Sequence, residues 1–309
     1  MTNETLEVIV FPGGFNWPIW AAQEIGAFNT QGIEVNLTPT KNSVQQMTGL
    51  IEGQYHIAMT AIDNVVAYQE GQGAAETAQE PDVFAFMGGD DGFLRLVVQS
   101  DIESYADLEG QELSVDAMTT GYAFVLLKML EKGGLADSQY KLVSAGGGME
   151  RWEALKGGQH AGTLLMTPFD ILAEFAGLRV LQSATDIFDQ YQGVIGTARR
   201  GWAKDHSQAL IAYIRAYLTG LNWLYDTNNK DQSLKVFIDN MPQTSPELAA
   251  RIYDILLDPQ GGFEPEARIN LEGVKTVLNL RSEYGKPQKN LTDPAAYFDP
   301  AYYNQAVAT

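Results

Sequence analysis

The 309-residue sequence has no cysteine, few basic residues and no long hydrophobic run. The absence of cysteine excludes disulfide bonds, thiolate metal sites and cysteine nucleophiles. Because 20 Lys and Arg stand against 39 Asp and Glu, the net charge is −19, which repels nucleic acid and anionic lipid. No segment approaches the roughly 20 apolar residues of a membrane-spanning helix. We therefore exclude nucleic-acid and membrane-surface partners.

The start of the sequence lacks the features of an export signal. Residues 1–6 have no basic start and no apolar segment before the first predicted strand. We expect either a cytoplasmic protein or one whose export signal is missing from this sequence. With 45% hydrophobic residues the chain can bury a large core, and its length favours about two domains.

One pattern of five residues, Met-Thr-x-x-Asp, occurs at 59–63 and again at 166–170. Each copy follows a predicted helix that ends at glycine, then a histidine and a short apolar run. In both copies the Thr and the Asp stand where a buried strand ends. Two such units suggest two α/β domains whose polar strand ends face each other across a cleft. Chance is the alternative, because a helix, a glycine and a strand often follow one another.

Apolar runs alternate with helical segments over the first two thirds of the chain. Strands are predicted at 6–11, 33–37, 83–87, 94–99, 112–115, 140–144, 179–181 and 191–197, and before each repeat. This alternation predicts a parallel, doubly wound sheet. After residue 204 the pattern changes to amphipathic helices, around 210–224, 233–238, 246–257 and 271–282. These late helices carry no concentrated set of polar side chains, so we predict a structural role for them.

A series of short motifs then resembles a known family. The motifs are Gly-Ala-Phe at 26–28, Gly-Ile-Glu-Val at 32–35, Leu-Ile-Glu-Gly at 50–53, Ala-Asp-Leu-Glu-Gly-Gln at 106–111 and Ala-Leu-Lys-Gly at 154–157. In order and spacing they resemble the solute-binding proteins of bacterial ABC importers for nitrate, sulfonates, taurine and thiamine-pyrimidine precursors. Those proteins have the type II periplasmic binding fold.

The resemblance implies two doubly wound α/β lobes with a ligand cleft between them. Residues 1–97 and 195–309 would form lobe 1, and the inserted residues 98–194 would form lobe 2. It also implies a periplasmic or cell-envelope monomer that delivers a small-molecule solute to ABC permease subunits, with no cofactor, no metal and no catalysis. Many family members carry Asp where His56 and His160 stand. We interpret both histidines as structural, because each precedes a buried strand.

The candidate ligand-binding residues end predicted strands or begin predicted helices. An aromatic side chain in the loop after the first strand can stack on a flat ligand or fill the core. Helix starts at Ser43 and Thr120 suit an anion, or are N-caps that need no ligand. The predicted ligand-binding set is Phe15, Trp17, Ser43, Thr60, Asp63, Gly89, Asp90, Thr119, Thr120, Tyr122, Met149, Thr167, Phe169, Asp170 and Tyr191.

Acids outnumber bases near these positions. Asp63, Asp90, Asp91, Glu150 and Asp170 stand against Lys41, Arg95 and Arg151. A dianion would find little counter-charge unless helix N-termini supplied it. We therefore predict a neutral or amine-bearing, aromatic or heterocyclic solute, unless several of these acids face solvent.

The alternative function is a cysteine-independent enzyme on the same fold, acting on a small heterocyclic or sulfonated substrate. Related desulfinases and pyrimidine-precursor synthases depend on cysteine, which this chain lacks. The sequence also has no P-loop, nucleophile elbow or metal-ligand motif. A ligand-sensing domain of a regulator is a third interpretation, although no output module is attached.

Overall fold

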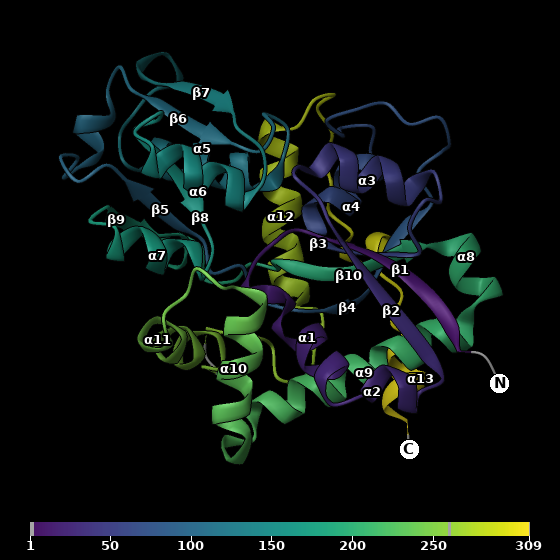
Figure 1. Cartoon of the computed structure of the whole chain (residues 1–309). Helices are drawn as coiled ribbons and strands as arrows, with labels where there is room; N and C mark the ends of the chain where they lie inside the picture. The colour runs from purple at the N-terminus through teal and green to yellow at the C-terminus, as the bar shows by residue number, and fades with distance from the viewer. Residues whose placement is uncertain (1–2, 259–260, 309) are drawn as a thin grey trace.

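The computed structural model describes residues 3–258 and 261–308 and contains two five-stranded sheets (Figure 1). In spatial order, the first sheet consists of β2 (Ile33–Pro39), β1 (Glu4–Val10), β3 (Ile57–Ala61), β10 (Val194–Arg199) and β4 (Val83–Gly88). Val8 of β1 lies opposite Leu37 on one side and Ile57 on the other, in parallel pairing. The second half of β1, residues 8–10, is apolar and buried, as expected where a strand is covered on both faces.

The second sheet has the same number of strands and a similar plan. Its spatial order is β7 (Lys141–Ser144), β6 (Glu112–Val115), β8 (Gly162–Leu165), β5 (Arg95–Val98) and β9 (Arg179–Ser183). Strands β6, β7 and β8 are parallel, and β5 is antiparallel to β8 and β9. We call the first sheet with its helices lobe 1, and the second sheet with its helices lobe 2. The α/β class predicted from the sequence is confirmed.

The expectation of wholly parallel sheets is wrong at one strand in each sheet. Strand β10 runs antiparallel to β3 and β4, just as β5 does in the second sheet. Both strands directly follow a connection between the sheets, at residues 184–193 and 89–94. The chain leaves one sheet at a strand's carboxyl end and enters the other at the edge facing it. It therefore runs against the parallel strands there.

The helices divide between the two sheets. Those packed around the first sheet are α1 (Trp17–Glu24), α2 (Ala27–Thr30), α3 (Ser43–Ile51), α4 (Ile62–Gln69), α8 (Arg200–Asp205), α9 (Ser207–Tyr225) and α13 (Ala301–Val307). Those beside the second sheet are α5 (Gly121–Lys132), α6 (Gly148–Lys156) and α7 (Phe169–Phe175). The apolar stripe of α9, including Leu210, Ile214 and Leu221, is buried as its helical spacing predicts.

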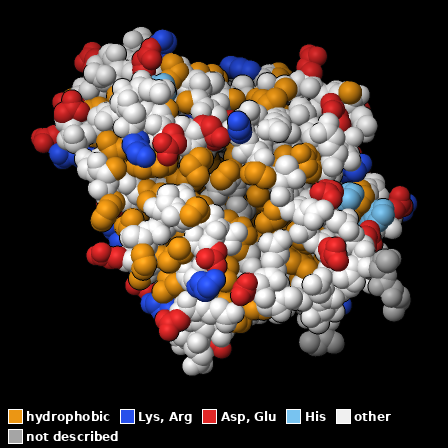
Figure 2. All heavy atoms as spheres, viewed as in Figure 1, with side chains coloured by type: hydrophobic (Ala, Val, Ile, Leu, Met, Phe, Trp, Pro, Cys, Tyr) orange, Lys and Arg blue, Asp and Glu red, His pale blue; other side chains and the backbone are white. Residues whose placement is uncertain are grey.

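Three further helices follow α9, and two of them contact helices of lobe 2. Helices α10 (Lys230–Asn240) and α11 (Pro246–Leu256) pack on each other, and α11 also contacts α7. Helix α12 (Leu271–Tyr284) lies in the middle of the molecule in Figure 1 and contacts α4 of lobe 1 and α5 of lobe 2. Because it contacts both, α12 is positioned to join the two lobes. On the face drawn in Figure 2, apolar side chains gather across the middle, and charged side chains lie mainly around them.

The exact division of the chain into lobes stays a prediction. Strand β5 pairs within the second sheet, although residues 95–97 were assigned to lobe 1 from the resemblance. We therefore propose that the chain crosses between the lobes at residues 89–94 and 184–193. The second of these connections leads directly into β10. Residues 1–2 and 309 of the predicted lobe 1 lie outside the described residues, as do 259–260.

His56 stands just before β3, at the end of the sheet remote from the strands' carboxyl ends. Its Nδ1 accepts a hydrogen bond from the Glu7 backbone N–H at 3.0 Å. Its ring stacks on Trp202 with 5.2 Å between centroids, and Trp202 stacks in turn on His206. These contacts give His56 a structural role. The backbone carbonyl of His160, in the other repeat, accepts from the Gln99 amide at 3.0 Å.

We expect His56 to make stability depend on pH. Burial lowers its pKa, the charges of His206 and Arg199 lower it further, and Glu7 and Glu4 oppose this. Below the ordinary value of 6.5 the unfolded chain binds the proton more readily, so stability is present above that pH and lost as pH falls. Urea unfolding at about pH 7.5 and about pH 5.5 should show this loss, and a smaller loss in His56→Gln. Equal pH dependence in both proteins would contradict it.

Candidate functional site

A cavity lies between the two lobes, with an empty volume of about 680 Å³ that includes the space at its mouth. Its walls come from residues after β1, at the end of β3, after β6 and after β8, together with the first turns of α4, α5, α6 and α7. Open α/β sheets bind ligands outside the carboxyl ends of their strands. The cavity is therefore placed where two such edges meet.

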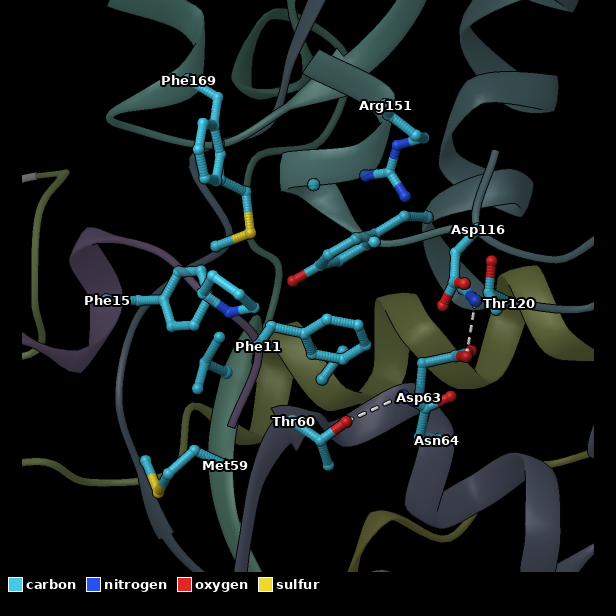
Figure 3. A pocket seen from close by; sticks show the side chains of 18 residues that line it. Phe11, Phe15, Met59, Thr60, Asp63, Asn64, Asp116, Thr120, Arg151 and Phe169 are labelled. Atoms are coloured by element: carbon cyan, nitrogen blue, oxygen red, sulfur yellow. Dashed lines mark hydrogen bonds between the residues drawn. The ribbon is translucent and has the colours of Figure 1, made fainter. Parts of the chain in front are cut away.

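Aromatic and sulfur-containing side chains form the apolar wall of this cavity. In Figure 3 the rings of Phe11, Phe15 and Phe169 face a shared space. Phe15 lies on the short 3-10 helix η1 (Gly14–Asn16), and Phe169 begins α7. A Cβ added to Gly148 would stand 3.4 Å from the Phe169 ring, so that wall is closely packed. Flat rings around an enclosed space favour an apolar or aromatic guest.

The polar wall on the lobe 1 side begins with the first sequence repeat. Thr60 Oγ1 accepts a hydrogen bond from Asn64 Nδ2 at 2.8 Å. Asp63, in the first turn of α4, forms a buried ion pair with Arg281 of α12, at 2.6 Å from Nε to Oδ1 and 2.8 Å from the terminal nitrogen to Oδ2. Arg281 is 0% exposed. The Asp63 charge is thus compensated from behind the cavity wall.

Each lobe gives one carboxylate to a helix N-terminus of the other lobe. Asp63 Oδ2 of lobe 1 accepts from the Gly121 N–H at the start of α5, at 2.5 Å. Asp116 Oδ2 of lobe 2 accepts from the Ser43 N–H at the start of α3, at 2.9 Å. Carboxylates are favourable there because the helix dipole is positive and the first N–H groups lack helical partners. We call these two contacts the reciprocal caps.

Further contacts join the lobes beside the reciprocal caps. The Gly147 N–H donates to the Lys41 carbonyl at 2.7 Å. A terminal nitrogen of Arg281 also donates to the Thr119 carbonyl at 2.5 Å. Because these bonds link elements of different sheets, the structure describes the lobes in a closed arrangement.

Among the described residues that line the cavity, three polar side-chain atoms have no hydrogen-bond partner: Arg151 Nε, Asp116 Oδ1 and Tyr122 Oη. Arg151 is 6% exposed, and its terminal nitrogens donate to the carbonyls of Gly146 at 2.9 Å and Leu164 at 3.1 Å. Burial lowers the pKa of Arg151, and the Asp116 carboxylate opposes that shift. Burial raises the pKa of Tyr122, which keeps the phenol neutral. Burying a polar atom without a hydrogen-bond partner costs free energy, unless a ligand or a water molecule forms the missing bond.

Six of the residues predicted as ligand-binding line the cavity: Phe15, Thr60, Asp63, Thr120, Tyr122 and Phe169. Two more lie at the contact between the lobes. Ser43 donates its backbone N–H to Asp116, and Thr119 accepts from Arg281 through its carbonyl. Both contribute backbone atoms to closure, and their side-chain hydroxyls have no partner.

The other predicted residues lie away from the cavity lining. Trp17 packs in the core against Phe237, with 4.6 Å between ring centroids. Asp170, the second copy of the repeated aspartate, pairs with Arg95 at 2.5 Å, and burial raises its pKa. Tyr191 packs beside Tyr122 in a tilted arrangement, with 6.3 Å between ring centroids.

Gly89, Asp90, Met149 and Thr167 complete this group outside the lining. Asp90 Oδ1 accepts from the N–H groups of Gly92 at 2.8 Å and Val194 at 3.1 Å, which fixes the crossovers. Burial raises the pKa of Asp90 to about 6. Neither Asp90 nor Asp170 lines the cavity, and Asp170 is paired with Arg95.

Sequence reasoning missed several residues of this site, and two of them had a usable signal. Arg281 follows Val277 and Leu278 by four and three residues, which puts it on the buried face of α12. Asp116 follows the strand predicted at 112–115, so it stands at a strand end like the residues that were named. Phe11 was predicted to be the last residue of the strand at 6–11. No local pattern marked Arg151 as a cavity residue.

Two other features are absent from residues 3–258 and 261–308. No group of three or more His, Asp or Glu side chains there is placed to hold a metal ion. No helix among those residues has the length and hydropathy to cross a bilayer.

The overall structure is similar to several solved binding proteins. For the periplasmic nitrate-binding protein NrtA from Synechocystis PCC 6803, the TM-score is 0.83 at 10% identity, covering 98% of this chain and 88% of that one. For the ligand-binding component of an ABC-type import system from Staphylococcus aureus, solved with zinc bound, the values are 0.77 and 12%, covering 99% and 100%. The alkanesulfonate-binding protein SsuA from Xanthomonas axonopodis pv. citri, bound to MOPS, gives 0.74 and 14%, covering 95% and 96%. The chain therefore has the fold of periplasmic binding proteins.

The family follows from the sequence itself. The model of the family described as NMT1/THI5 like matches residues 16–230, so the chain belongs to the NMT1/THI5-like family. No curated protein matches the sequence. The family suspected from the short motifs is confirmed.

Proposed function

We propose that this protein is the solute-binding component of an ABC-type importer and that its solute is a small aromatic or heterocyclic compound, neutral or amine-bearing. The observation that carries the proposal is the cavity between the carboxyl edges of two sheets, walled by the rings of Phe11, Phe15 and Phe169. The fold shared with nitrate-binding, sulfonate-binding and ABC-type import proteins supports the transport role.

The charges around the cavity favour a solute without net negative charge. Both helix N-termini that were candidates for an anion, at Ser43 and Thr120, are approached by carboxylates of the opposite lobe. Among the described lining residues Arg151 is the one base, and Asp116 lies close enough to affect its pKa. A flat solute that both donates and accepts hydrogen bonds at its edge satisfies the unpartnered polar atoms.

Binding follows a clamp mechanism. An open form admits the solute, and closure forms the reciprocal caps and buries the rings around it. The closed surface is what a membrane permease would recognise, so we propose delivery to permease subunits from the periplasm or cell envelope by a monomer. We propose no chemical change, because Asp63 is already committed to Arg281 and the α5 N-terminus.

A thermal-shift screen of amines, neutral heterocycles and sulfonates tests this solute class. At about 100 times the dissociation constant a ligand stabilises by about 2.7 kcal/mol, so the correct solute should raise Tm by about 5 °C or more. Phe11→Ala should remove most of that shift, because it removes one ring of the wall. The control Phe175→Ala changes a side chain that is 69% exposed and should leave the shift intact. A shift confined to sulfonates would contradict the proposal.

A further inference from the structure

The structure assigns to Asp116 the selection against anionic solutes. This inference rests on the proposed function and adds to it the residue that determines solute charge. Asp116 stands directly after β6 of lobe 2 and lines the cavity, and it reaches the start of α3 in lobe 1.

Asp116 occupies a position that suits an anion. Its Oδ2 accepts from the Ser43 N–H at 2.9 Å. Ser43 itself is 2% exposed, and its hydroxyl has no partner. An anionic group of a solute would gain from this N–H and from the positive end of α3. In the closed protein the Asp116 carboxylate already accepts this hydrogen bond, so an anionic solute does not obtain that stabilisation.

The other oxygen of the same carboxylate is available to a donor group of the solute. Asp116 Oδ1 is buried and has no hydrogen-bond partner. Arg151 Nε is likewise without a partner, on a side chain that is 6% exposed and points into the space drawn in Figure 3. A neutral donor group on the solute satisfies Asp116 Oδ1, and a neighbouring acceptor satisfies Arg151. An anion meets the Asp116 charge instead, and like charges placed together in an interface are costly.

Asp116 differs from Asp63, the other carboxylate that caps a helix. Asp63 is held by two hydrogen bonds from Arg281, at 2.6 and 2.8 Å, so its charge is compensated by α12. Asp116 forms no ion pair with a described residue within salt-bridge distance. Of the two carboxylates that line the cavity, Asp116 is therefore the one without an ion pair, and the lining base Arg151 offsets only part of its charge.

Two probes of nearly equal shape, benzenesulfonamide and benzenesulfonate, test this assignment by isothermal titration calorimetry. Wild type should prefer the neutral sulfonamide. Asp116→Asn keeps an oxygen for the Ser43 N–H but removes the charge, so the affinity ratio should move toward benzenesulfonate by about tenfold or more. Asp116→Ser, measured alongside, gives a second variant of smaller volume.

Asp101→Asn is the matched control, because it removes the same charge from an exposed site of lobe 2. It should leave the ratio unchanged. The role of Asp116 is overturned if wild type binds the sulfonamide and both Asp116 variants have the same affinity ratio for the two probes as wild type. The proposed function would still stand in that case. Binding of neither probe by any of the proteins would count against both proposals. A ratio that moves equally in Asp101→Asn would show a general charge effect and also overturn the assignment.

Discussion

Replacing Arg281 by methionine is expected to lower the free energy of unfolding by about 3–5 kcal/mol, because it leaves a carboxylate buried without its cation. Arg281 is 0% exposed and donates to both oxygens of Asp63. It also donates to Gln72 Oε1 at 3.2 Å and to the Thr119 carbonyl at 2.5 Å. One side chain therefore joins α12, α4 and the start of α5.

Urea unfolding of Arg281→Met measures this loss. Arg268→Met is the control, since Arg268 is exposed, pairs with Glu266 at 3.1 Å and should change stability by less than about 1 kcal/mol. Adding Asp63→Asn to Arg281→Met removes the unpaired charge and should recover part of the loss. If Arg281→Met is as stable to urea as Arg268→Met, the buried pair does not stabilise the fold as we propose.

Changing Gly121 to alanine is expected to prevent closure of the clamp. A Cβ at this position would stand 2.2 Å from Asp63 Cγ and 2.5 Å from its Oδ1, so the lobes cannot reach the described arrangement. Asp63 cannot easily move aside, because Arg281 holds both of its oxygens. If the closed form binds the solute, losing it should weaken affinity by more than about 100-fold. Titration with the best solute of the screen measures this.

Gly201→Ala is the matched control for Gly121→Ala. It also places alanine near a helix start, and its Cβ has no heavy atom within 4 Å. Small-angle scattering should show that wild type and the control compact on adding solute, whereas Gly121→Ala stays extended. Wild-type affinity and compaction in Gly121→Ala would contradict closure through this contact.

The local patterns of the sequence were enough to place most elements and the general position of the cavity. Thr60 and Asp63 of the first repeat line it, as strand-end residues were expected to. In the second repeat the lining residues are Met166 and Phe169, one position before Thr167 and one before Asp170. Because side chains next to each other along a chain point in different directions, a repeated motif gives the location of the site and leaves its orientation open.

The remaining features depend on pairing between distant residues. Arg281 is 218 residues from Asp63, and Asp116 is 73 residues from Ser43. Periodicity reports which face of an element is buried, and it carries no information on which partner lies opposite. The reversed strands β5 and β10 are similar, since their direction follows from where the chain crosses between sheets. The excess of acids also looked larger in sequence than it is, because Arg281, which holds Asp63, was not among the bases counted.

A crystal structure of the protein with the best solute of the screen tests the central claim most directly. We expect electron density for the unchanged solute between the rings of Phe11 and Phe169, with an acceptor atom at Arg151 Nε. Density for that solute elsewhere on the molecule, or for a chemically altered product in the cavity, would contradict the account.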